Sequence, residues 1–130
     1  MASTAPLISI VDDDLSVRRA LGRLVQSAGY AVATFASAGE FLDSPALAQV
    51  ACLVLDISLD GMSGFDLKER LAMEHPSLPI IFITALDEAT TRERFRRSGV
   101  AAQLRKPFDE HTLLQAIRRA LDQGPFDHYS

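Results

Sequence analysis

The chain has 130 residues, a typical length for one domain with one substantial hydrophobic core. Hydrophobic residues make up 48% of it, with only 6 Pro and 7 Gly, so the composition indicates a globular protein rather than a disordered one. The net charge of −4 disfavours nucleic-acid binding by bulk charge, and no apolar run approaches the roughly 18 residues that a membrane span requires.

The N-terminal residues and the cysteine content bear on the compartment. The start, MASTAP, lacks the basic and apolar regions of a secretory signal. The single cysteine, Cys52, lies in the apolar run ACLVLD and has no partner for an internal disulfide. We therefore expect a cytoplasmic protein in which Cys52 is a core residue.

Short apolar segments alternate with longer amphipathic ones from the N-terminus onward. Residues 7–11 (LISIV) predict a first strand. Residues 16–27 carry apolar side chains at helical spacing, and Gly29 is expected to end that helix. Residues 31–35 (AVATF) alternate in the manner of a second strand.

The middle of the chain continues the alternation. Residues 37–48 predict a weaker helix, bent or broken near Pro45. Residues 51–55 (ACLVL) form a continuous apolar run, which is typical of a strand covered on both faces. Residues 65–75 predict a helix that ends before Pro76.

The last third completes the pattern. Residues 80–84 (IIFIT) predict a buried strand, 88–98 a helix with a highly charged surface, 101–105 a short strand and 110–122 a clear helix. Five strand–helix pairs in strict alternation predict an α/β protein with a parallel sheet and helices on both faces. We expect one domain over residues 1–122, and residues 123–130 to be a short tail or the start of a linker.

Polar residues gather where these strands end. The first strand is followed by three aspartates at 12–14, the third by Asp56, the fourth ends in Thr84 and the fifth reaches Lys106. The carboxyl ends of parallel strands lie at one edge of a sheet, where open α/β sheets place their functional groups. Taken alone, the three aspartates suit an ordinary solvated turn, but their convergence with the other groups favours a functional site.

These residue types suit a magnesium-assisted phosphoryl transfer. Mg²⁺ prefers oxygen ligands and is usually held by one or two carboxylates, with waters and phosphate oxygens. A carboxylate can also attack phosphorus and form an aspartyl phosphate. A hydroxyl and an ammonium group nearby would stabilise the phosphoryl oxygens.

The motifs VDDD, LVLDISLDGMSG, FITA and KPF occur here in the order and approximate spacing of a known family. From about residue 7 to residue 122, the chain resembles the receiver domain of two-component response regulators. The resemblance implies a flavodoxin-like, doubly wound, five-stranded parallel sheet of order 2-1-3-4-5 with five helices. It also implies a signalling switch rather than an enzyme, although a receiver catalyses its own phosphoryl transfer.

The resemblance assigns roles to particular residues. Asp56 would be the phosphoacceptor. Magnesium would be bound directly by Asp13, Asp56 and the backbone carbonyl of Ser58, and by Asp12 through water. Thr84 would be the switch hydroxyl and Lys106 the phosphate-binding lysine.

The same resemblance implies partners. Receivers take the phosphoryl group from a phosphohistidine on a sensor kinase or phosphotransfer protein, or from small phosphodonors. Phosphorylation would change the face formed by helix 88–98, strand 101–105 and helix 110–122, where a partner or a second copy could bind. Four arginines in TRERFRRSG (91–99) are either a solvated helix face or part of that output surface. We expect neither membrane nor nucleic-acid binding by this domain itself.

Two departures from the family pattern affect the switching mechanism. Leu59-Asp60 replaces the usual Met-Pro, which removes a rigid proline and adds a carboxylate near the site. Gln103 stands where the family has a rotating aromatic residue, and a polar amide does not repeat the burial of the ring to which Thr84 is usually coupled.

Several alternatives stay open at this level. An interaction module that works without phosphorylation is compatible with Gln103. A haloacid-dehalogenase-type phosphatase would also use a strand-end aspartate as nucleophile. That family has a second Asp two residues later as general acid, and this chain has Ser58 at that position. Asp14 or Ser16 would cap the first helix.

Overall fold

A computed structural model describes residues 5–56, 64–84, 102–105 and 109–123. Its strands are β1 (Leu7–Val11), β2 (Ala31–Phe35), β3 (Val50–Asp56), β4 (Ile80–Thr84) and β5 (Ala102–Arg105). Its helices are α1 (Leu15–Ser27), α2 (Ala38–Leu42), the short 3₁₀ helix η1 (Pro45–Ala48), α3 (Gly64–Glu74) and α5 (Glu110–Gln123). The expected helix over 88–98 lies outside the described residues.

The five strands form one parallel sheet in the order β2-β1-β3-β4-β5, as predicted. β1 and β3 are adjacent, with Ile10 opposite Val54 and Val11 opposite Leu55. The chain leaves β1 toward one edge and returns on the other side of it, which is the doubly wound arrangement. The carboxyl ends of β1 and β3 therefore lie side by side near the middle of the sheet.

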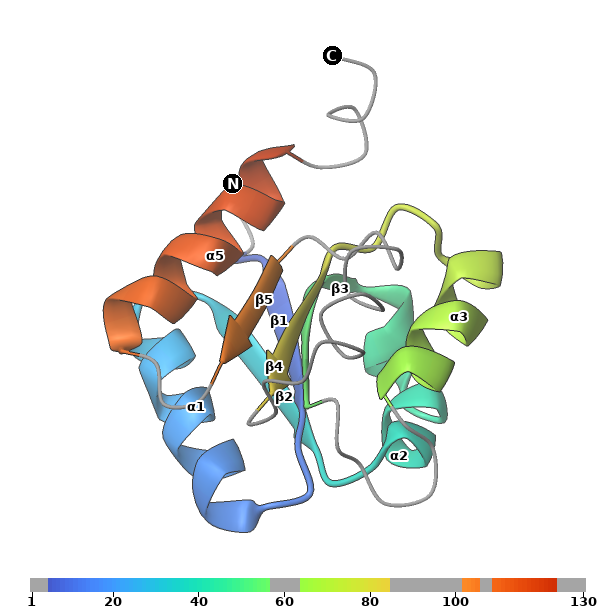
Figure 1. Ribbon diagram of the computed structural model, residues 1–130, viewed down its shortest axis with the longest axis horizontal. Coiled ribbons are helices and arrows are strands. Elements are labelled where there is room, and N and C mark those ends of the chain that lie inside the picture. The colour runs from blue at the N-terminus through green and yellow to red at the C-terminus, as the bar shows by residue number, and fades with distance from the viewer. Residues whose placement is uncertain (1–4, 57–63, 85–101, 106–108, 124–130) are drawn as a thin grey trace.

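Helices cover both faces of the sheet (Figure 1). α1 and α5 lie on one face, and α2 and α3 lie on the other. Each face has its own buried apolar cluster, with Ile8, Val25 and Ile117 in the first and Phe41 and Phe82 in the second. The continuous apolar runs of β3 and β4 follow from this, because strands covered on both faces bury every side chain.

Glycine and proline lie at the helix boundaries where their backbone conformations are favourable. The residue after the C-cap of α1 is Gly29, whose φ of 100° is a left-handed conformation that glycine adopts without steric penalty. The predicted helix over 37–48 is broken, as expected: α2 ends at Leu42 and η1 begins with Pro45. Ala20, one of the apolar residues at helical spacing in α1, is exposed rather than packed on the sheet.

Cys52 is a core residue, as predicted, with a fully buried side chain in the cluster beneath α1 and α5. Within the described part of the chain, no helix is long and apolar enough to cross a membrane.

Candidate functional site

An acidic cluster lies at the carboxyl ends of the two central strands. Asp12 and Asp13 directly follow β1, and Asp56 is the last residue of β3. Since Val11 is paired with Leu55, the next residue on each strand brings Asp12 beside Asp56. Strand register therefore places together carboxylates that are more than forty positions apart in the sequence.

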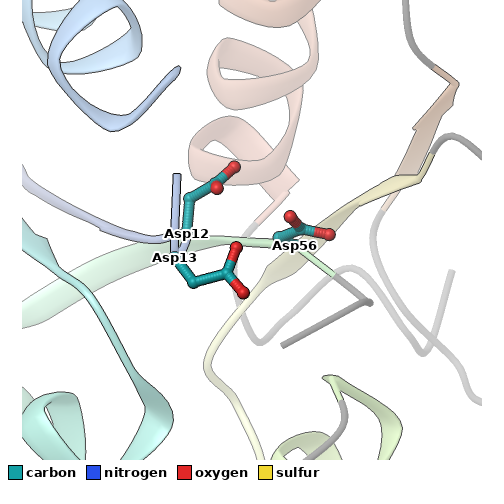
Figure 2. A group of neighbouring side chains, drawn as sticks. All are labelled: Asp12, Asp13 and Asp56. Atoms are coloured by element: carbon teal, nitrogen blue, oxygen red, sulfur yellow. The ribbon is translucent and has the colours of Figure 1, made fainter. Parts of the chain in front are cut away.

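The three side chains are close enough to share one ion. One carboxylate oxygen from each of Asp12, Asp13 and Asp56 lies within 4.8 Å of the others. Figure 2 shows them gathered where β1 and β3 end. Asp12 and Asp56 are buried, with 1% and 7% of their surfaces exposed, whereas Asp13 is exposed. The cluster thus has two buried carboxylates and one that faces solvent.

Backbone contacts hold the strand end in place. The backbone N–H of Asp12 donates to the carbonyl of Phe35 at 3.1 Å, which extends the pairing of β1 with β2 by one residue. Oδ1 of Asp12 accepts the backbone N–H of Asp14 at 2.9 Å, so the chain turns tightly around the Asp12 carboxylate. This turn directs the next carboxylate, that of Asp13, toward the end of β3 (Figure 2).

Asp14 has a different role from its two neighbours. Its Oδ1 accepts the backbone N–H groups of Ser16 at 2.9 Å and Val17 at 3.2 Å, and it is the N-cap of α1. Of the two capping residues that the sequence allowed, the structure has Asp14. The run of three aspartates therefore combines half of an acidic cluster with one helix cap.

One contact at this site was not predicted from the sequence. Nη1 of Arg18, the fourth residue of α1, donates to the backbone carbonyl of Asp12 at 2.7 Å. The only signal in the sequence is that Arg18 is the first basic residue after the aspartates. An arginine side chain on the first turns of a helix can fold back toward its start, but spacing alone does not identify its acceptor.

The donor set of the cluster fits a hard divalent cation. All three side chains offer carboxylate oxygens, and Mg²⁺ or Ca²⁺ prefers such ligands. Two oxygens on opposite sides of an octahedral Mg²⁺ are about 4.2 Å apart, twice the Mg–O distance of about 2.1 Å. The three carboxylate oxygens of the cluster lie within 4.8 Å of one another, which is close to this distance of about 4.2 Å between opposite ligands.

Of the other predicted site residues, Thr84 and Gln103 have positions in described strands, and the rest lie outside the described residues. Thr84 ends β4, the strand next to β3, where its backbone is paired with Arg105. Gln103 lies in β5 opposite Phe82 of β4. Ser58, Asp60, Lys106 and the arginine-rich run at 91–99 lie outside the described residues. The roles that the sequence suggests for all of these residues stay predictions.

The fold and the site together define the class of protein: a doubly wound α/β protein with an acidic cluster at the carboxyl ends of its central strands. Within that class, residues 8–118 match the family model of the response regulator receiver domain. The chain belongs to this family, whose members are phosphoaccepting signalling switches of two-component systems rather than true enzymes. This membership favours the switch over the phosphatase alternative.

Named relatives agree with the family assignment. The chain is 39% identical over 122 residues to nodulation protein W of Bradyrhizobium diazoefficiens, covering 94% of this chain and 54% of that protein. It is 38% identical over 125 residues to the response regulator protein TodT of Pseudomonas putida, covering 96% and 55%. The chain thus spans about half the length of the curated relatives it matches.

Solved structures have the same fold. A response regulator receiver domain protein (CheY-like) from Methanospirillum hungatei superposes with a TM-score of 0.85 at 28% identity, covering 92% of this chain and 96% of that one. The response regulator StyR gives a TM-score of 0.84 at 40% identity, covering 97% of this chain and 64% of that one. The receiver fold predicted from the sequence is confirmed.

Proposed function

We propose that this receiver domain accepts a phosphoryl group on Asp56 in a Mg²⁺-dependent reaction. The observation that carries the proposal is the cluster of Asp12, Asp13 and Asp56, with one oxygen of each within 4.8 Å of the others. Such a cluster suits a site that binds a cation and a phosphoryl group together. Membership of the receiver family supports the same assignment.

The proposed ligands of Mg²⁺ are Asp13 and Asp56 directly, Asp12 through a water molecule, and the backbone carbonyl of Ser58. Bound there, the ion would offset the negative charge that develops on the transferring phosphoryl oxygens. Asp12 is buried and fixed by its bond from the Asp14 N–H, which suits a residue that orients a water rather than one that moves with the ion. Asp13 is exposed, which suits a direct ligand at the solvent side of the site.

In the transfer itself, a carboxylate oxygen of Asp56 attacks the phosphorus of the donor. For a phosphohistidine donor the P–N bond breaks, its electron pair stays on the imidazole nitrogen, and an acyl phosphate forms on Asp56. The hydroxyl of Thr84 and the ammonium group of Lys106 would donate hydrogen bonds to the phosphoryl oxygens. A sensor histidine kinase or a phosphotransfer protein is the proposed donor.

The added charge of roughly −1.5 to −2 is the proposed signal. It would draw Thr84 toward the phosphoryl group at the end of β4 and shift the face that includes β5 and α5. The arginine-rich run at 91–99 belongs to the same proposed face. A partner protein or a second copy of the chain would bind there.

The output of the whole protein is a further proposal. Similar proteins include one named as the DNA-binding transcriptional regulator NtrC of Klebsiella pneumoniae, of which this chain covers 24%. For a regulator of that kind, DNA binding would belong to other segments of the polypeptide, and the receiver itself would contact no nucleic acid. We place such a regulator in the cytoplasm.

Incubation with acetyl phosphate and Mg²⁺, followed by intact-protein mass spectrometry, tests the proposal. We expect the wild type to gain the mass of one phosphoryl group and Asp56→Asn to gain none, because an amide cannot form the acyl phosphate. Asp14→Asn is the matched control: it removes a carboxylate two residues from Asp12 but retains an oxygen that can cap α1. It should be labelled like the wild type.

Two results would contradict the proposal. Labelling of Asp56→Asn at the wild-type level would remove Asp56 as the phosphoacceptor. An unlabelled wild type, tested also with beryllofluoride as a phosphoryl mimic and showing no change in oligomeric state, would favour an interaction module that works without phosphorylation.

A further inference from the structure

Arg18 makes a specific contact with the backbone of the acidic site. Its Nη1 lies 2.7 Å from the carbonyl oxygen of Asp12, a distance typical of a charge-assisted hydrogen bond. Arg18 itself is partly buried, whereas the next residue on the same helix, Arg19, is exposed. The contact links α1 directly to the end of β1.

The accepting carbonyl belongs to the peptide that joins Asp12 to Asp13. The orientation of this peptide sets the direction in which the Asp13 side chain leaves the backbone relative to that of Asp12. The preceding peptide is fixed by the bond from the Asp12 N–H to Phe35 at 3.1 Å. Arg18 therefore holds the one peptide between the two carboxylates, in a turn that follows the last paired residue of the strand.

We propose that Arg18 is a positioning residue for the magnesium site: by holding the Asp12 carbonyl, it sets the Asp13 carboxylate at a fixed place relative to Asp12 and Asp56. This inference rests on the proposed function and goes one step beyond it. Mg²⁺ demands near-ideal octahedral geometry, so a freely rotating Asp13 would bind it more weakly. Removal of a group that orients a metal ligand typically lowers the metal affinity by about 10- to 100-fold.

The charge of Arg18 has an opposing effect, because a cation beside the site repels an incoming Mg²⁺. The site sets three carboxylate groups, those of Asp12, Asp13 and Asp56, against this single positive charge. The guanidinium is also directed to the Asp12 carbonyl oxygen, to which it donates its hydrogen bond. Loss of the fixed geometry should therefore outweigh relief of the repulsion, and removal of Arg18 should weaken Mg²⁺ binding.

The test compares Arg18→Met with Arg19→Met in the full chain. Each variant loses one positive charge from α1 and keeps a long side-chain stem, but only the first loses the bond to Asp12. Mg²⁺ alone is titrated by amide chemical shifts, and the rate of phosphorylation by acetyl phosphate is measured against Mg²⁺ concentration. We expect the Kd for Mg²⁺ to rise about 10-fold in Arg18→Met and to stay at the wild-type value in Arg19→Met.

The design separates the possible failures. A Kd in Arg18→Met equal to or lower than that of Arg19→Met overturns the inference, and so does a lower Tm without Mg²⁺ accompanied by an unchanged Kd. If Arg18→Met does not fold, Arg18→Leu against Arg19→Leu replaces it, because leucine also lacks an N–H donor: a higher Kd only in Arg18→Leu supports the inference, and equal values overturn it. A wild type that neither binds Mg²⁺ nor is phosphorylated overturns the proposed function itself.

Discussion

Burial has opposite consequences for Cys52 and Asp12, which both lie on or next to central strands. A neutral thiol behaves as a small apolar group, so Cys52 is accommodated in the core with its side chain fully buried. A buried carboxylate needs hydrogen bonds or a counter-charge, and Asp12 has a bond from the Asp14 N–H. Burial to the same extent therefore indicates a packing role for the apolar Cys52 side chain and a functional role for the Asp12 carboxylate.

The chemistry of Cys52 follows from this burial. Desolvation raises the pKa of the Cys52 thiol from 9.0 to about 12, because the interior disfavours the thiolate. The thiolate is the reactive form, so we expect iodoacetamide at pH 8.5 to label the native protein very slowly and the urea-unfolded protein readily. Equal rates in the two states would contradict the buried position.

The same shift predicts a dependence of stability on pH. The folded-state pKa is raised, so the unfolded chain loses the thiol proton first as the pH increases. The contribution of the protonated Cys52 thiol to the free energy of unfolding is therefore fully present below about pH 9 and is lost as the pH rises toward 12. Other groups also titrate there, so the unfolding free energy of the wild type is compared with that of Cys52→Ala, which should lose less stability over this window.

At the scale of elements, the first helix shows how local chemistry places a boundary. Asp14 at the N-cap and Gly29 beyond the C-cap enclose α1. α5 begins in a similar way, since Asp109 accepts the backbone N–H and the hydroxyl of Thr112, each at 2.7 Å. These two hydrogen bonds lower the pKa of the Asp109 carboxyl group, the hydroxyl bond being the larger cause.

The cap of α1 gives a prediction at this scale. Asp14→Ala should lower the free energy of unfolding by about 1 kcal/mol, because the N–H groups of Ser16 and Val17 lose their acceptor. Asp14→Asn, which keeps a capping oxygen, should lose much less. Urea unfolding followed by circular dichroism measures both variants, and equal losses in the two would show that the cap has no specific role.

The helix predicted over 37–48 illustrates the limits of local patterns. Its apolar spacing is helical, but Pro45 lacks the N–H that an inner helical position would need. The structure places Pro45 at the first position of η1, after α2 has ended at Leu42. The sequence predicted the break, whereas the exact ends of both pieces depend on their packing against β2 and β3.

At the scale of the whole molecule, the acidic cluster couples folding to cation binding. Folding brings Asp12 and Asp13 from one strand end next to Asp56 from another, where their charges repel one another. The unfolded chain does not hold these carboxylates together. A cation that binds only the folded cluster will therefore stabilise the fold by mass action.

We expect the Tm of the wild type to rise with MgCl₂ in thermal unfolding experiments. At ten times its Kd, Mg²⁺ would add about 1.4 kcal/mol, which corresponds to a Tm increase on the order of 4 °C for a domain of this size. Asp56→Asn should have a higher Tm than the wild type without Mg²⁺, because repulsion is reduced, and should respond less to the ion.

Potassium chloride at matched ionic strength is the control for general charge screening. If it raises the Tm of the wild type as much as MgCl₂ does, the cluster is not a specific site. Absence of any rise up to tens of millimolar Mg²⁺ would have the same meaning.

The α/β alternation, the parallel sheet and the strand ends at which Asp12 and Asp56 lie could all be predicted from the amino-acid sequence. These depend on periodicity, turn chemistry and the rule that parallel strands end at one edge, all of which are local or topological. The alignment of β1 with β3 that brings Asp12 beside Asp56, and the contact of Arg18 with the Asp12 carbonyl, depend on tertiary packing. Register and side-chain direction result from packing the helices on the sheet, and residue spacing along the chain does not specify them.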